Sequence, residues 1–281
     1  MQIRKVAVVG GGTMGNGIAH VFAQHSYDVV LIDVDEQRLQ TAVQTIRGNL
    51  DRQVKKAALS ETDAAAAVAR IRTTTKRADA AGADLIIEAV PERLDLKVEV
   101  LQEVGRAAPD AIVASNTSSI SITALAAHCK QPDRVIGMHF MNPVPVMKLV
   151  EVIRGLQTSD DTARTVVSLA ESLGKTAVEA NDFPGFVSNR VLMPMINEAI
   201  FCVLEGVASP ESIDTVMKLG MNHPIGPLAL ADLIGLDTCL SIMEVLHHDL
   251  GDDKYRPCPL LRNYVAAGWL GRKSGRGFYT Y

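Results

Sequence analysis

The sequence predicts an α/β protein, in which a Rossmann-like doubly wound sheet is followed by an all-helical C-terminal domain. Three observations predict this class. The chain begins with a β-branched run, a glycine-rich turn and a helical pattern, the order of a βαβ unit. Continuous apolar runs of strand length follow, of the kind buried in a parallel sheet. From Phe186 onward only helical periodicity remains, so we expect domains at 1–184 and 185–281.

Composition excludes several classes of protein. A hydrophobic content of 47% and a charged content of 21% are typical of a globular protein with ordinary domains. The net charge is only −4 and no basic tract occurs, so nothing favours nucleic-acid binding. The four cysteines form no Cys-x-x-Cys pair, which predicts neither a disulfide framework nor a metal site. The longest apolar stretch, Phe186–Val207, is interrupted by polar residues and a proline. We therefore expect a cytoplasmic protein without a secretory signal or a membrane span.

A glycine-rich turn follows the first predicted strand. Residues Gly10–Gly15 read Gly-Gly-Gly-Thr-Met-Gly and fit the pattern Gly-x-Gly-x-x-Gly. In this context Gly10 permits a tight turn, Gly12 lets the backbone approach a pyrophosphate, and Gly15 allows close packing of helix and strand. Asp33 ends the next strand, 33 − 15 = 18 residues beyond the last glycine. Its carboxylate can bind an adenosine ribose and would repel a 2′-phosphate, so the sequence predicts a dinucleotide site that prefers NAD to NADP.

Two polar segments each have two interpretations. The cluster Ser115–Ser119 follows the buried strand Ala111–Ala114, where active groups of doubly wound sheets gather. Such a turn can equally cap the next helix. The helical stretch Glu36–Lys56 carries a polar face with several basic residues near its end. That face is either solvated or a contact for an anionic carrier such as a nucleotide phosphate.

One histidine and one carboxylate end two neighbouring apolar runs. His139 follows Arg134–Met138, and Glu151 follows Met147–Val150, with an Asn-Pro-Val-Pro turn between the runs. Two adjacent strands joined in this way could bring His139 and Glu151 side by side. A carboxylate in that position fixes the imidazole tautomer and stabilises the imidazolium, as a general base requires. A core histidine beside a surface glutamate is the alternative, and the two residues alone do not decide between them.

Several motifs occur together in one order along the chain. They are Gly-x-Gly-Thr-Met-Gly at 10–15, Ser115–Ser119, His139–Pro143, Pro184–Arg190, Gly226–Asp237 and Gly271–Tyr279. Together they closely resemble the L-3-hydroxyacyl-CoA dehydrogenases, including the bacterial 3-hydroxybutyryl-CoA dehydrogenases. The resemblance covers essentially the whole chain and is more specific than any single motif.

The resemblance implies an oxidoreductase of fatty acid metabolism. It would interconvert (S)-3-hydroxyacyl-CoA, here 3-hydroxybutyryl-CoA, and 3-oxoacyl-CoA by hydride transfer to and from NAD. His139 would be the base, Glu151 the acid that orients it, and Ser118 and Asn189 would bind the substrate oxygen. The acyl-CoA would also contact Asn49 and Lys56, and the helical domain would form a homodimer. The residues implied to contact NAD are Gly10, Gly12, Thr13, Met14, Gly15, Asp33, Glu92, Lys97, Asn142 and Lys273. No metal is implied.

Three positions depart from the family's usual pattern. Gly11 is commonly alanine, Phe183 stands where threonine is usual, and Ser188 where valine is common. The last two could reshape the acyl pocket and leave the chain-length preference open. Two alternatives also stay open: a dehydrogenase of the same fold that acts on a non-CoA 3-hydroxy acid or a carrier-protein-bound acyl group, and a noncatalytic NAD-binding protein. The presence of all four predicted catalytic side chains argues against the noncatalytic alternative.

Overall fold

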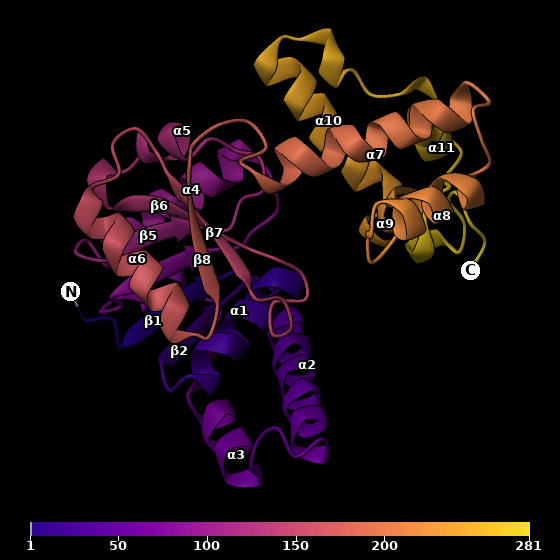
Figure 1. Cartoon of the computed structure of the whole chain (residues 1–281). Coiled ribbons are helices and arrows are strands. Elements are labelled where there is room, and N and C mark those ends of the chain that lie inside the picture. Colours follow the sequence, from indigo (N-terminus) through magenta and orange to yellow (C-terminus); the bar gives the residue numbers. More distant parts are fainter. Residues whose placement is uncertain (1) are drawn as a thin grey trace. The chain divides into compact units, whose positions relative to one another are not determined.

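An eight-stranded sheet forms the first of two units in the computed structural model, which describes residues 2–281 (Figure 1). Its strands lie in the order β3-β2-β1-β4-β5-β6-β7-β8. They are β1 (Lys5–Val9), β2 (Asp28–Ile32), β3 (Ile71–Thr74), β4 (Leu85–Glu88), β5 (Ile112–Ser115), β6 (Val135–Phe140), β7 (Leu149–Arg154) and β8 (Thr176–Asn181). Neighbouring strands are parallel except β6 and β7, so β7 and β8 run against the other six. The loops after β1, β2, β4, β5 and β6 therefore meet at one edge of the sheet.

Helices cover both faces of this sheet, as a doubly wound fold requires. The helices of the first unit are α1 (Thr13–Gln24), α2 (Glu36–Lys55), α3 (Glu61–Ala69), α4 (Leu94–Ala107), α5 (Ile122–Ala126) and α6 (Asp160–Ser172). Buried side chains of α1, α2, α3 and α6 form one core with alternate residues of the strands. The predicted fold class is confirmed.

Alternation along β6 and β7 places His139 and Glu151 on the same face. Both chain neighbours of His139, Met138 and Phe140, belong to the core under α1 and α6. Both neighbours of Glu151 belong to the same core. Because successive side chains of a strand point to opposite faces, His139 and Glu151 point to the other side.

The second unit begins at Pro184 and contains only helices as regular elements within the part of the chain described. They are α7 (Ser188–Leu204), α8 (Pro210–Gly220), α9 (Pro227–Ile234), α10 (Leu236–Leu250) and α11 (Pro259–Ala266), with short 3-10 helices at Asp253–Tyr255 and Arg272–Ser274. Helix α7 contacts α9, α10 and α11 around a separate apolar core. The division between the two units falls between Phe183 and Pro184. Among residues 2–281, no helix is both long enough and apolar enough to cross a membrane.

Two buried aspartates bind the C-terminal tail to the helices of the second unit. Asp214 accepts the backbone N–H groups at the start of α9 and the Tyr279 hydroxyl, at 2.8 to 2.9 Å. Asp232 accepts the N–H groups of Phe278 and Tyr279 at 3.0 Å. A Cβ at Gly277 would lie 2.0 Å from Asp232 Oδ1, so only glycine lets the tail approach this carboxylate. Asp232 and Gly277, which belong to the Gly226–Asp237 and Gly271–Tyr279 motifs, therefore have a structural role.

His20 of α1 is a fully buried imidazole with incomplete hydrogen bonding. Its Nε2 lies 3.1 Å from Gln24 Oε1, whereas its Nδ1 is buried without a hydrogen-bond partner among the residues described. Burial, assisted by the nearby Lys175 ammonium and opposed by the hydrogen bond with Gln24, lowers the pKa of His20 from 6.5 to about 4.

This lowered pKa predicts a loss of stability in mild acid. The unfolded chain binds a proton at His20 below about pH 6.5, whereas the folded chain resists protonation until about pH 4. The free energy of unfolding therefore falls as the pH is lowered through this window, by roughly 2 kcal/mol between pH 7 and pH 5. Urea unfolding of the wild type and of His20→Asn at both pH values measures the effect. His128→Asn, at an exposed histidine, is the matched control. Equal pH dependence of stability in the wild type and His20→Asn would contradict the prediction.

Candidate active site

The glycine turn and the ends of β2 and β4 surround a cavity of about 390 Å³. Gly10, with φ of +108°, could not carry a side chain, because a Cβ would lie 2.5 Å from the Ala89 carbonyl oxygen. A Cβ at Gly15 would lie 1.6 Å from the Gly10 oxygen. At Gly12, the N-cap of α1, a Cβ would meet no atom within 4 Å. Open space thus lies over the turn at the helix N-terminus, where a pyrophosphate of NAD fits and a side chain would intrude.

Asp33 connects the glycine turn to the end of β2. Its Oδ2 accepts the Gly11 N–H at 2.7 Å, and its Oδ1 accepts the Asp35 N–H at 3.0 Å. Arg38 on α2 places its guanidinium 3.6 Å from Oδ2 and is half exposed. Sequence reasoning missed Arg38. The sequence could have indicated Arg38, because it is a basic residue in the first turns of the helix after Asp33, where a cation can lie beside the adenosine ribose.

A second cavity, of about 470 Å³, also borders the glycine turn. Asn142, in the loop after β6, and Asn49, on α2, both line it together with Gly12 and Thr13. Lys56 is the C-cap of α2 and is exposed. It lies seven residues after Asn49, which places the two on the same side of the helix. The structure thus joins Asn142 and Asn49 in one cavity, while Lys56 lies outside it.

His139 and Glu151 are direct cross-strand partners in the antiparallel pair β6–β7. His139 Nδ1 lies 2.8 Å from Glu151 Oε2, and both residues are buried, with 9% and 2% of their surface exposed. A carboxylate accepts the proton of Nδ1, so the neutral imidazole carries its basic lone pair on Nε2. Strand β7 continues beyond Glu151 to Arg154, which corrects the expectation that the run ends at the carboxylate. The end of β6 is further fixed by Asn116, whose Oδ1 accepts the Phe140 N–H at 3.0 Å.

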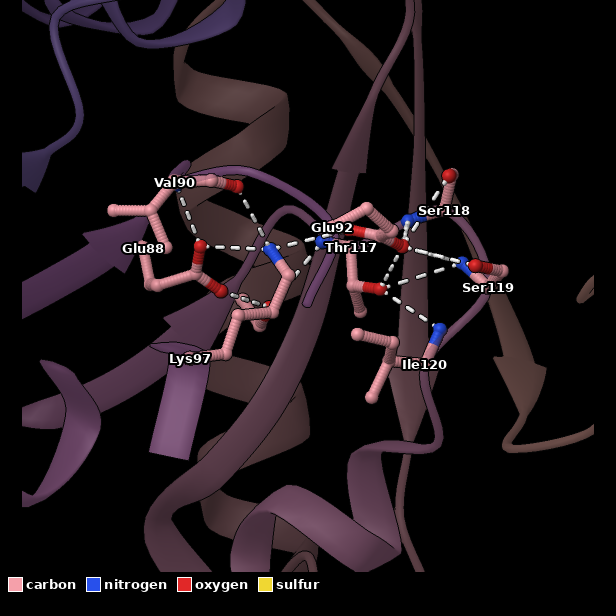
Figure 2. A network of polar contacts seen from close by, with 9 residues as sticks. Glu88, Val90, Glu92, Lys97, Thr117, Ser118, Ser119 and Ile120 are labelled. Carbon is pink, nitrogen blue, oxygen red and sulfur yellow. Dashed lines mark hydrogen bonds and ion pairs between the residues drawn. The ribbon is translucent and has the colours of Figure 1, made fainter. Parts of the chain in front are cut away.

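Glu92 connects the loop after β4 to the Ser115–Ser119 loop (Figure 2). Its Oε1 accepts the backbone N–H groups of Ser118 and Ser119 at 2.9 and 3.0 Å, and the Thr117 hydroxyl. Burial alone would raise the pKa of Glu92, but the Lys97 ammonium and these hydrogen bonds outweigh it and lower that pKa below its usual value. Glu92 is therefore an ionised carboxylate that holds the loop carrying Ser118.

Lys97 is only 1% exposed, which argues against the predicted contact between Lys97 and the cofactor. Its ammonium has three acceptors, Glu88, Glu92 and the Val90 carbonyl, so its three N–H groups are used within the protein. Lys273 lies in the second unit, where it pairs with Asp237 at 2.6 Å. Asn189 also belongs to the second unit, in the first turn of α7, and is buried.

A doubly wound sheet with this glycine turn and Asp33, together with a buried histidine–carboxylate pair, defines an NAD-dependent dehydrogenase. Residues 5–183 match the profile of the 3-hydroxyacyl-CoA dehydrogenase NAD binding domain, and residues 185–281 match that of the 3-hydroxyacyl-CoA dehydrogenase C-terminal domain. The chain belongs to the 3-hydroxyacyl-CoA dehydrogenase family. This confirms the predicted family and the predicted NAD cofactor.

Individual relatives agree with this assignment over their full length. A protein of Bacillus subtilis named as a probable 3-hydroxybutyryl-CoA dehydrogenase is 59% identical, with 100% of this chain and 98% of the relative covered. The crystal structure of (S)-3-hydroxybutyryl-CoA dehydrogenase from Ralstonia eutropha superposes with a TM-score of 0.97 at 55% identity, covering 100% and 99% of the two chains. The structure of a diketoreductase, an enzyme named for catalysis on dicarbonyl compounds, superposes on this chain with a TM-score of 0.88 at 32% identity, and both chains are fully covered.

Proposed function

We propose that this protein interconverts (S)-3-hydroxybutyryl-CoA and acetoacetyl-CoA. The observation that supports this most directly is the buried His139–Glu151 pair, at 2.8 Å, in a chain of this family. The identities of 59% and 55% to relatives named for this substrate favour a short acyl group. The diketoreductase shows that the fold also serves carbonyl compounds named without CoA, so the carrier has to be tested.

His139 moves the proton in the proposed reaction. Its Nε2 accepts the 3-hydroxyl proton as the C3–H bond breaks, and C3 becomes a carbonyl carbon. NAD, when bound, supplies the acceptor for the hydride that leaves C3. Glu151 stabilises the resulting imidazolium, because a buried carboxylate at hydrogen-bond distance favours the charged form of the ring. Ser118 and Asn189 are proposed to donate hydrogen bonds to the substrate oxygen, and Asn49 and Lys56 to contact the CoA moiety.

The substrate form is tested with purified protein, NADH and three acceptors. These are acetoacetyl-CoA, free acetoacetate and an acetoacetyl group on acyl carrier protein. We expect rapid loss of NADH absorbance with the CoA thioester and at most slow loss with the other two. Equal or faster turnover of the free acid or of the carrier-protein thioester would favour the corresponding alternative substrate.

Asp33→Asn should weaken the preference for NADH over NADPH. The amide oxygen can still accept the Gly11 N–H, so the turn is retained, but the charge that repels a 2′-phosphate is lost. Arg38, 3.6 Å from this carboxylate in the wild type, then offers a cation to that phosphate. The ratio of kcat/KM for NADPH to that for NADH should rise about tenfold, as for a partly exposed charge contact. Arg38→Gln in the Asp33→Asn background should reverse much of the gain. An unchanged ratio in Asp33→Asn would show that Asp33 does not select the cofactor.

The second unit is proposed to form a homodimer. Val216, Leu219 and Met221, at the end of α8 and its C-cap, are 60%, 83% and 60% exposed, which leaves an apolar group for a second copy to cover. Light scattering should give twice the mass of one chain, and a monomer at micromolar concentration would contradict this.

We place the reaction in fatty acid metabolism in the cytoplasm, where the four unpaired cysteines would stay reduced.

A further inference from the structure

We infer that Lys97 is a positioning residue for the substrate side of the site: together with Glu88 it fixes Glu92, and Glu92 fixes the loop that carries Ser118. The role of Ser118 toward the substrate rests on the proposed function. The positioning of its loop rests on contacts within the first unit alone.

The first step of the inference is the enclosure of the Lys97 ammonium. Figure 2 shows it between the carboxylates of Glu88 and Glu92. Its Nζ lies 2.7 Å from Glu88 Oε1, 3.2 Å from Glu92 Oε2 and 3.2 Å from the Val90 carbonyl oxygen. The side chains of Lys97 and Glu88 are 1% and 0% exposed, whereas that of Glu92 is 36% exposed. Lys97 is therefore anchored from the interior, and Glu92 is the member of the group that reaches the site.

Both oxygens of the Glu88 carboxylate, which holds Lys97, accept further hydrogen bonds. Its Oε1 also accepts the Val90 N–H at 2.7 Å, and its Oε2 accepts the Ser115 hydroxyl at 2.6 Å. Ser115 is the last residue of β5, and its hydroxyl oxygen in turn accepts the Thr117 N–H at 3.2 Å. The rigid ends of β4 and β5 thus determine where the ammonium lies.

The second step is the contact of Glu92 with the loop. Glu92 Oε2 faces Lys97, while Oε1 accepts hydrogen bonds from three successive residues, Thr117, Ser118 and Ser119. An ionised carboxylate accepts all of these hydrogen bonds, whereas a protonated carboxyl would compete as a donor. Without the ammonium, two carboxylates would lie close together in a buried region, and the charged form of Glu92 would be disfavoured. Loss of Lys97 should therefore release the loop that carries Ser118.

Three measurements on Lys97→Met test the inference, with Lys130→Met, at an exposed lysine, as the matched control. The Kd for NADH, measured by fluorescence, should rise by a smaller factor than kcat falls, because the glycine turn and Asp33 are unchanged and only Glu92 is displaced. Exchange of the Ser118 amide hydrogen, followed by mass spectrometry of residues 115–120, should accelerate at least about tenfold. With acetoacetyl-CoA, kcat should fall at least about tenfold and KM should change less, because Ser118 would act mainly on developing charge.

A second variant keeps the test decisive if Lys97→Met does not fold. Thr117→Val removes the hydroxyl that donates to Glu92 without burying a charge, and Thr117→Ser restores it. The valine variant should show the fast Ser118 exchange and low kcat, and the serine variant should behave like the wild type.

The contradicting results are distinct from failure of the proposed function. A tenfold weaker Kd for NADH with unchanged Ser118 exchange in Lys97→Met would show that Lys97 serves the cofactor and would overturn the inference. Wild-type Ser118 exchange in Thr117→Val would also overturn it. If the wild type does not turn over acetoacetyl-CoA, the proposed function fails, while NADH binding and Ser118 exchange still decide how Lys97 acts.

Discussion

His139→Gln is expected to lower kcat with acetoacetyl-CoA by at least about 10²-fold, as loss of a general base or acid does. Glutamine can occupy the same site and hydrogen-bond to Glu151, but it cannot exchange a proton with the substrate at neutral pH. The glycine turn and Asp33 are unchanged, so NADH should bind with the wild-type Kd. Steady-state kinetics and NADH fluorescence titration measure both quantities.

His128→Gln is the control for this variant, because His128 is an exposed histidine away from β6. It should retain wild-type kcat. Wild-type turnover by His139→Gln would refute the assignment of His139 as the group that moves the proton.

Glu151→Gln is expected to lower kcat by about 10²-fold with little change in stability. The carboxylate accepts the Nδ1 proton at 2.8 Å, whereas an amide can also donate to Nδ1 and so favour the tautomer with its proton on Nε2. The variant also loses the negative charge that stabilises the imidazolium. Since Glu151 is 2% exposed, replacing it with a neutral isostere leaves no charge buried without a partner.

The double variant His139→Gln/Glu151→Gln separates a joint role from two independent ones. If Glu151 acts only through His139, the double variant should be about as slow as His139→Gln alone. If the two losses in kcat multiply, Glu151 has a function of its own and the account of the pair is wrong. Thermal unfolding of all three variants shows whether any loss is due to misfolding.

The central strands of the sheet could be predicted because they are buried on both faces. Continuous apolar runs such as Leu85–Glu88 and Ile112–Ser115 are typical of such strands. Strand β3, Ile71–Thr74, was not predicted. Its sequence is short and half polar, and it becomes a strand by backbone pairing with β2 at the edge of the sheet. Tertiary pairing of this kind has no local signature. Helix α11 was also missed.

The candidate site was predictable where the chemistry depends on local order along the chain. The glycine turn, Asp33 and the His139–Glu151 hairpin are of this kind, because one turn and one register fix their geometry. The environment of Lys97 was not predictable, since its acceptors on β4 and in the following loop close around it only in the folded chain. Family resemblance assigned this lysine to the cofactor, and its burial argues for a different role.

The measurement that tests the central claim most directly is NAD reduction by the two stereoisomers of 3-hydroxybutyryl-CoA. The protein is mixed with NAD and either the (S) or the (R) thioester, and formation of NADH is followed by absorbance. The proposed function predicts NADH formation with the (S) isomer, its near absence with the (R) isomer, and its loss in His139→Gln. Absence of NADH formation with the (S) thioester, in protein that binds NADH, would contradict the assignment of this site as a 3-hydroxyacyl-CoA dehydrogenase centre.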